Sequence, residues 1–569
     1  MKRGGNPDVD GPLATRASPC SGVASLAEAE RANGDRRAGP DQAGARPRYG
    51  GEEVLLAIAL GVLVAIVLLA RHFPYQDAPN HLARYVLISR AWAGEATPGV
   101  EVYFAPGPYF AIDVLGVALV RAVGAKAAGK VLALTGILAV PCGMYLLLRA
   151  VSWARRGWAL VGVLLALSWF LLAGMINYTI GLGGALAWLA LWWNARTARA
   201  ARVRLALAAG MAALYLVHLV APLVALLVVW VDTLLASIPV LSAAWRRPAA
   251  RRAAALRTVV WELVRRPAFV TALLVSGVAA VLWLWTWRVQ AGIPVPPMEA
   301  VFRSPGNKLL ALGAPIYSFS VVQAGIQAAA YVAALVAFVR ANPAAMRLDT
   351  FTLSTGLLLA LFVVFPKDGA VSGLDIRWPL PALLLVFCVT TPTRACPQRA
   401  WLLVAFAGCL AHAGVVTAYV RDFDARLDEY DVVLGRVPRG ARLLSAHLDG
   451  DLYPRIGPYM QYSLWHVVRG HGEAPGLFSV TPLRDDPPFP HLRHFVVRRR
   501  SYTPAPRRDG ALPAIAWDSV AADYDYLVLV DPRGRARRAV ASHACEVARQ
   551  GAVTLHRVGC RPPPAASGG

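Results

Sequence analysis

The chain has 569 residues, of which 57% are hydrophobic and only 16% are charged. Many apolar runs approach the ~20 residues needed to cross a bilayer, so the sequence is that of a polytopic membrane protein. The net charge of +24 would suit a nucleic-acid-binding protein, but the arginines cluster in short loops between apolar runs, as the positive-inside rule predicts. Nucleic acid is therefore excluded as a partner, and the lipid bilayer is expected to be one.

Residues 1–50 are rich in Gly, Ala, Pro, Asp and Arg and show no apolar periodicity, which predicts a disordered N-terminal tail. The first apolar run, 54–70, has no small-residue cleavage site after it, so we expect an uncleaved first span. It opens a transmembrane domain that we expect to cover 51–420, with a long outer loop at 71–130.

The beginning of this outer loop carries three polar residues at helical spacing. Asp77, His81 and Arg84 lie at i, i+4 and i+7. If Pro79 is the first helical residue, His81 and Arg84 share a helix face and Asp77 lies just before the helix. A carboxylate, an imidazole and a guanidinium suit proton abstraction and phosphate binding. The alternative is an interfacial amphipathic helix whose charges are only solvated.

The apolar stretch 109–123 is expected to be a juxtamembrane or re-entrant helix. It contains Asp113 and Arg121, and an Asp near the centre of a span costs roughly 2.5–3.5 kcal/mol. If this stretch does not cross, the later arginine-rich loops all fall on the inner side. Eleven crossings then follow, with the N-terminus cytoplasmic. The ten after the first are expected at 131–148, 158–173, 178–193, 205–218, 220–240, 268–286, 318–339, 350–365, 378–391 and 400–420.

From residue 421 the apolar runs shorten to strand length, at 442–446, 526–530 and 553–558, with a helical pattern around 536–550. This alternation predicts a small extracytoplasmic α/β domain over 421–560, followed by a disordered tail at 561–569. Cys545 and Cys560 would pair if this domain is exported, and would otherwise stay free.

Four further residues are candidates for binding at the outer face. Lys367 and Arg377 suit a phosphate, or they snorkel from span ends to lipid headgroups. Asn177 either bonds a substrate or caps the next helix. His218 is either a ligand or a bond between helices. The sequence has no Gly-rich phosphate loop, HExxH, GxSxG or CxxC motif, so ATP hydrolysis and metalloprotease or serine-esterase chemistry have no support.

The assembled layout resembles the GT-C class of polytopic membrane glycosyltransferases, in particular its uncharacterised bacterial members. The similarity includes the first span, the acidic residue early in the outer loop, the juxtamembrane helix and the α/β tail. Four short motifs carry it: QDAPNHL at 76–82, GMINY at 174–178, LVH at 216–218 and DIRWP at 375–379.

The resemblance implies transfer of a sugar from a polyprenyl-phosphate donor to a lipid, glycan or protein acceptor, at the outer face of the inner membrane. Asp77 would be the catalytic carboxylate. Arg377, Lys367 and Arg84 would hold the donor phosphate, with His81, Asn177 and His218 as further binding residues. Many members carry paired acidic residues in this loop, whereas Asp77 has no acidic neighbour before Glu95. No cofactor is certain, and a divalent metal is left open.

Two alternatives to the glycosyltransferase function remain at this stage. One is a transporter or lipid flippase, and the other is a non-catalytic membrane protein of GT-C ancestry. Most charges lie at span ends rather than in mid-span, which favours the enzyme over the transporter.

Overall fold

The computed structural model describes residues 50–95, 101–102, 107–246, 249–290, 300–342, 348–367, 373–389, 398–447, 455–474, 497–498, 517–534 and 536–560. The predicted tails at 1–50 and 561–569 lie outside these residues, apart from Gly50.

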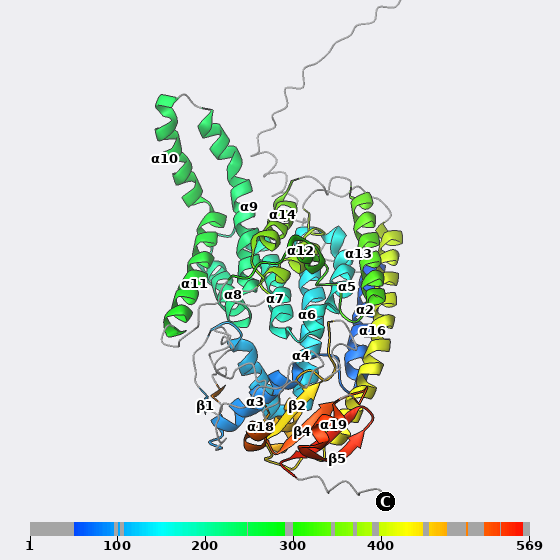
Figure 1. Cartoon of the computed structure of the whole chain (residues 1–569). Helices are drawn as coiled ribbons and strands as arrows, with labels where there is room; N and C mark the ends of the chain where they lie inside the picture. Colours follow the sequence, from blue (N-terminus) through cyan, green and yellow to red (C-terminus); the bar gives the residue numbers. More distant parts are fainter. Residues whose placement is uncertain are drawn as a thin grey trace, which may run out of the picture. The chain divides into compact units, whose positions relative to one another are not determined.

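Within the described residues, six helices are long and apolar enough to cross a membrane. They are labelled in Figure 1 as α2 (Gly51–Leu69), α4 (Phe110–Val151), α9 (Val220–Trp245), α11 (Pro267–Gln290), α13 (Val321–Ala341) and α16 (Gln398–Leu434). Three predicted spans form helices that are shorter or less apolar: α7 (Ile176–Ala195), α8 (Ala201–Val217) and α14 (Thr350–Val364). Other helices are α3 (Ala78–Trp92), α10 (Ala249–Arg265), α12 (Pro305–Leu312), α17 (Trp465–Gly470), α18 (Trp517–Asp523) and α19 (Arg537–Ala541). The chain is therefore a mostly helical membrane protein.

Single helices at 158–173 and 378–391 were expected, and this is wrong. The first range holds the end of the 3-10 helix η2 (Trp153–Ala159), α5 (Leu160–Ala166) and α6 (Trp169–Leu172), and the second holds α15 (Pro379–Leu385). Seven helical residues extend only about 10 Å. The breaks are tolerated because protein groups satisfy the backbone there, as where Gln327 Nε2 donates to Leu164 O at 2.8 Å.

The predicted helix at 109–123 is present as the first part of α4. Gly124, with φ 78° and ψ 162°, separates it from the following segment, which runs to Val151. A residue with a Cβ rarely adopts this conformation, so glycine permits the kink. The position of the first part relative to the bilayer stays a prediction.

The C-terminal sheet has four strands in the order β2-β4-β6-β5. Strand β2 (Leu443–His447) is parallel to β4 (Tyr526–Val530), which pairs antiparallel with β6 (Val553–Val558), and β6 pairs antiparallel with β5 (Ala544–Gln550). The three predicted strands are confirmed. The helical pattern expected up to 550 is wrong beyond α19, because pairing with β6 overrides local helix propensity in β5.

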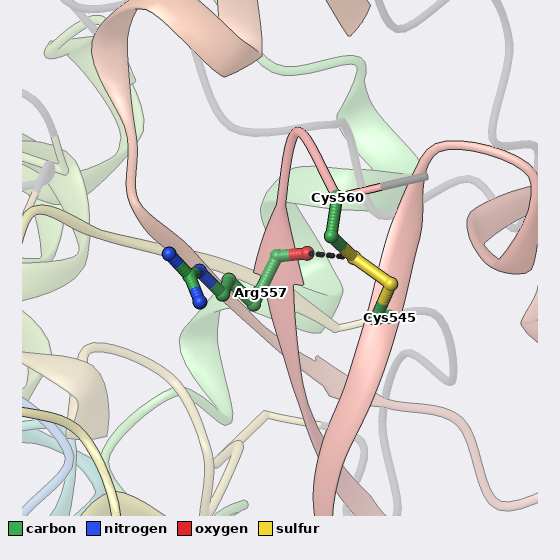
Figure 2. Close-up of a disulfide and its surroundings, with 3 residues drawn as sticks. All are labelled: Cys545, Arg557 and Cys560. Atoms are coloured by element: carbon green, nitrogen blue, oxygen red, sulfur yellow. Dashed lines mark hydrogen bonds between the residues drawn. A yellow bond between two sulfur atoms is a disulfide. The ribbon is translucent and has the colours of Figure 1, made fainter. Parts of the chain in front are cut away.

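The sheet packs on the end of α16, which runs past residue 420 without a break. Tyr430 and Val433 of α16 share one buried cluster with Val528 and Val530 of β4. Outside this sheet, the short strands β1 (Glu101–Val102) and β3 (Val497–Arg498) pair with each other. A disulfide joins Cys545 at the start of β5 to Cys560 after β6 (Figure 2). The Cys560 sulfur lies 3.3 Å from the carbonyl oxygen of Arg557.

Candidate active site

One cavity of about 480 Å³ collects most of the residues that the sequence singles out. Six of the seven predicted site residues line it: Asp77, His81, Asn177, His218, Lys367 and Arg377. Asp77 precedes α3 and His81 lies within it, Asn177 lies in α7, and His218 lies between α8 and α9. Lys367 follows α14, and Arg377 ends the 3-10 helix η4 (Asp375–Arg377). A smaller cavity of about 60 Å³ contains none of them. The motifs, far apart in sequence, therefore meet in space.

Asp77 lies at the start of α3 and packs closely against the turn at Gly174. It is the N-cap residue of α3, with Pro79 in the first turn, and its side chain makes no capping bond. The neighbouring Gln76 N–H donates to Leu172 O at 2.9 Å. Gly174, between α6 and α7, has φ +98°, and a Cβ added there would lie 2.4 Å from Asp77 Cβ. Only glycine fits this approach without displacing Asp77.

The Asp77 carboxyl lies in surroundings that disfavour its charge. It is only partly exposed, and its Oδ1 atom has no hydrogen-bond partner among the described residues. Burial raises the pKa of Asp77 from 3.8 to about 7, opposed by a hydrogen bond from the Gln76 side chain. A carboxyl with this pKa is divided between its acid and base forms near neutral pH, which suits a general base.

His81 is neutral and serves as part of the frame around Asp77. Burial lowers the pKa of His81 from 6.5 to about 4. Its Nε2 lies 3.2 Å from Gly174 O, and because a carbonyl only accepts, Nε2 carries the proton. The ring stacks between Tyr75 and Tyr85, at centroid distances of 6.1 and 6.2 Å. His81 thus holds the Gly174 turn beside Asp77.

Arg84 is the one predicted site residue that does not line the cavity. Its Nη2 donates to Asp113 Oδ2 at 2.6 Å, and both side chains are buried. The charge of Asp113 on α4 draws the guanidinium to the α3–α4 contact. Contact of Arg84 with a ligand in this cavity therefore has no geometric support.

Asn177 and His218 differ in how their polar atoms are used. Met175 is the N-cap of α7, so the prediction that Asn177 caps this helix is wrong. The Oδ1 atom of Asn177 is buried and has no hydrogen-bond partner among the described residues. His218 Nδ1 accepts from Val220 N at 3.1 Å. Its Nε2 therefore carries the proton and donates to Tyr109 Oη, also at 3.1 Å. His218 orients Tyr109, whereas the Asn177 amide oxygen is left for a ligand.

Four cations line the cavity, and we call them the cavity cations: Arg303, Lys367, Arg377 and Arg455. Arg303 Nε donates to the buried Asp375 at 2.8 Å. Arg377 has a buried Nε without a hydrogen-bond partner among the described residues. Asp77 is the one carboxylate among the described lining residues. Positive charge therefore exceeds negative charge, as an anionic ligand requires.

Arg303 and Arg455 were not among the predicted site residues. Arg303 lies two residues before α12. Arg455 comes from the C-terminal part and lies over the Trp169 ring, with its guanidinium carbon 4.2 Å from the ring centroid. Burial, and then the charge of Arg303, lower the pKa of Arg455 to about 10. No local pattern marks these positions, because tertiary contacts alone bring them to the cavity.

The residues at this cavity do not fit a metal ion. The described part of the chain holds no group of three or more His, Cys, Asp or Glu side chains placed to bind one. Of the two histidines that line the cavity, His81 directs Nε2 to a carbonyl and His218 uses both ring nitrogens. We derive no step through a metal.

These helices, the sheet and the cavity define a polytopic membrane protein with a polar site at the ends of its helices. The chain is similar to ArnT from Cupriavidus metallidurans in the apo state, with a TM-score of 0.51 and 14% identity, covering 89% of this chain and 97% of ArnT. The structure of the same ArnT bound to undecaprenyl phosphate gives a TM-score of 0.49 and 12% identity, covering 91% and 100%. No protein-family model and no curated protein sequence matches the chain. At this identity the likeness concerns the fold alone, which is the GT-C fold.

Proposed function

We propose that the protein is a membrane glycosyltransferase that moves a sugar from a polyprenyl-phosphate donor to a hydroxyl group of a lipid, glycan or protein. The observation that carries the proposal is the meeting of Asp77, whose pKa is about 7, with four cations in one cavity. The GT-C fold supports it, because glycosyltransferases are built on this fold.

In the proposed reaction Asp77 is the general base. The acceptor oxygen attacks the anomeric carbon, its proton moves to the Asp77 carboxylate, and the bond from that carbon to the phosphate oxygen breaks. Negative charge grows on the departing polyprenyl phosphate, where preorganised cations stabilise it most. Arg377 is the best placed of the cavity cations for this task, because its Nε has no protein partner among the described residues. With Asp77 as the one carboxylate among the described lining residues, we infer a single displacement, with inversion at the anomeric carbon.

We place the cavity and the C-terminal domain on the outer face of the inner membrane. The arginine-rich loops favour this orientation through the positive-inside rule. The Cys545–Cys560 disulfide also favours it, because disulfides persist in oxidising compartments. The acceptor then approaches from outside the membrane, and the donor from within the bilayer.

A transporter or flippase would instead need a binding site near the middle of the membrane. The cavity residues Asp77, Asn177 and His218 lie at the ends of α3, α7 and α8 rather than in the middle of a long helix, which favours transfer over transport. A non-catalytic protein would not need a carboxyl held at a pKa of about 7.

The test compares cells that lack the gene and carry wild type, Asp77→Asn or Asp518→Asn. Asp518 is an exposed carboxylate on α18 and serves as the matched control. Mass spectrometry of surface glycans should show one sugar lost in the deletion strain and in Asp77→Asn, and restored by Asp518→Asn. Full restoration by Asp77→Asn, at equal protein abundance, would refute Asp77 as the base.

A further inference from the structure

One wall of the cavity comes from the C-terminal part of the chain. Residues 455–460, here called the strap, supply Arg455 and Met460 to it. Trp169 Nε1 donates to Arg455 O at 3.2 Å, and the Arg455 guanidinium donates to Ala314 O and Tyr317 O at 3.5 and 3.4 Å. These contacts fasten the beginning of the strap to the membrane helices.

Gln76 fastens the other end of the strap, and it does so from the residue next to Asp77. Its Oε1 accepts from Gly457 N at 2.9 Å, and its Nε2 donates to Met460 Sδ at 2.7 Å. Asp77 is the next residue in the chain, and the Gln76 side chain lowers the pKa of its carboxyl against the larger effect of burial. Both halves of one amide therefore bind the strap, from the residue that directly precedes Asp77.

We propose that Gln76 is a positioning residue that joins the strap to Asp77, so that Arg455 and the Asp77 carboxyl take their places in the cavity together. The contacts of Gln76 are independent of any assigned activity. Their consequence for sugar transfer rests on the proposed function. The arrangement lets the C-terminal part of the chain influence the base of the reaction through one side chain.

The ionisation of Asp77 reports on this link. Tyr75 and His81 lie beside Asp77, while Tyr109, Tyr178, His218 and the cavity cations line the cavity. Replacing Gln76 leaves all of these groups in the chain. The Gln76 side chain lowers the pKa of Asp77, so its removal should raise that pKa.

The experiment uses the purified full-length protein in lipid nanodiscs and needs no substrate. Infrared difference spectroscopy follows the protonated carboxyl band of Asp77, identified by its loss in Asp77→Asn. Hydrogen–deuterium exchange follows the Gly457 amide. In Gln76→Ala the Asp77 midpoint should rise by about one pH unit, because the group that favours the charged carboxylate is gone. The Gly457 amide should exchange at least tenfold faster.

Gln76→Glu separates the two contacts. A glutamate oxygen still accepts from Gly457 N–H, so exchange there should stay slow. The amide donor is lost and a like charge is added, so the Asp77 midpoint should rise further than in Gln76→Ala. Gln550→Ala, at an exposed position in β5, is the control and should change neither measurement.

An unchanged Gly457 exchange rate in Gln76→Ala, or an unchanged Asp77 midpoint in both Gln76 variants, would overturn the proposal. These outcomes are distinct from failure of the proposed function. If Asp77→Asn keeps full glycan synthesis while both readouts respond to Gln76, the link stands and the catalytic role falls.

Discussion

Arg84 of α3 and Asp113 of α4 form an ion pair at 2.6 Å, with side chains only 3% and 2% exposed. The pair joins the helix that begins at Asp77 to the first part of α4, which begins after Tyr109. Both Asp77 and Tyr109 line the cavity. The ion pair therefore fixes two cavity elements relative to each other without contacting a ligand.

Breaking this pair on one side should destabilise the protein strongly. Arg84→Met or Asp113→Asn alone leaves a buried partner uncompensated, at a cost of about 3–5 kcal/mol. The double variant Arg84→Met with Asp113→Leu should recover most of the loss, because no buried charge remains. Thermal denaturation of the purified protein in detergent measures this. Single variants as stable as the double variant would show that the pair does not carry the α3–α4 contact.

The start of α3 could be predicted from sequence, because Pro79 and the spacing of Asp77 and His81 are local signals. The destination of Arg84 could not, because its partner lies 29 residues away. Arg455 was missed for the same reason, since nothing near it in sequence shows that it reaches Trp169. Such contacts depend on how helices pack rather than on any pattern along the chain.

The broken helices were missed for a different reason. Hydropathy records how apolar a segment is, not whether its helix continues, and the residues around Leu167 and Val386 are mostly apolar. Ser168 lies at the first break, but one serine barely lowers the hydropathy of the segment, and groups such as the Gln327 amide satisfy the interrupted backbone. The break at Leu167 is what allows α6 and the Gly174 turn to approach Asp77.

Gly174→Ala should impair the site more than the fold. The added methyl group meets Asp77 and also disfavours the φ of +98°, a strain of about 1–2 kcal/mol. If Asp77 is the base, as proposed, its displacement by a fraction of an ångström should lower sugar transfer tenfold or more. Gly277→Ala on α11, where a Cβ meets nothing within 4 Å, is the control. Equal glycan yields from the two variants would contradict the proposed contact.

Arg377→Gln should weaken binding of polyprenyl phosphate. Loss of a charge-assisted hydrogen bond of about 1.5–3 kcal/mol corresponds to at least a tenfold lower affinity. Native mass spectrometry with undecaprenyl phosphate measures it in purified protein. Arg377→Lys should recover binding only in part, because a lysine cannot form the planar bidentate contact. Arg199→Gln, exposed between α7 and α8, should bind as wild type does. Unchanged binding by Arg377→Gln would place the phosphate elsewhere.

The disulfide offers a test of orientation. A membrane-impermeant maleimide should label Cys545 and Cys560 in intact cells only after reduction. Replacing both cysteines by serine should loosen β5 and β6, since closing a loop of about 15 residues contributes about 3 kcal/mol. Faster proteolysis of the sheet would show this. Labelling that requires permeabilised cells would place the domain on the cytoplasmic side.

The pKa of Asp77 near 7 gives two linked dependences on pH. A general base is inactive when protonated, so transfer should fall as pH drops below about 7 and level off above it. Stability should change in the opposite direction. Because the folded carboxyl keeps its proton between pH 3.8 and about 7 while the unfolded one releases it, the free energy of unfolding falls as pH rises through this window. His81, whose pKa is lowered to about 4, acts oppositely between about 4 and 6.5.

A comparison with Asp77→Asn isolates the first of these two groups, because His81 is present in both proteins. The asparagine cannot lose a proton, so the variant should have a higher melting temperature than wild type at pH 8, and the difference should shrink toward pH 4. Thermal denaturation across this range checks the sign. A variant that is less stable than wild type at pH 8, or a gap that widens as pH falls, would mean that the carboxylate is stabilised by the cavity cations rather than strained by burial.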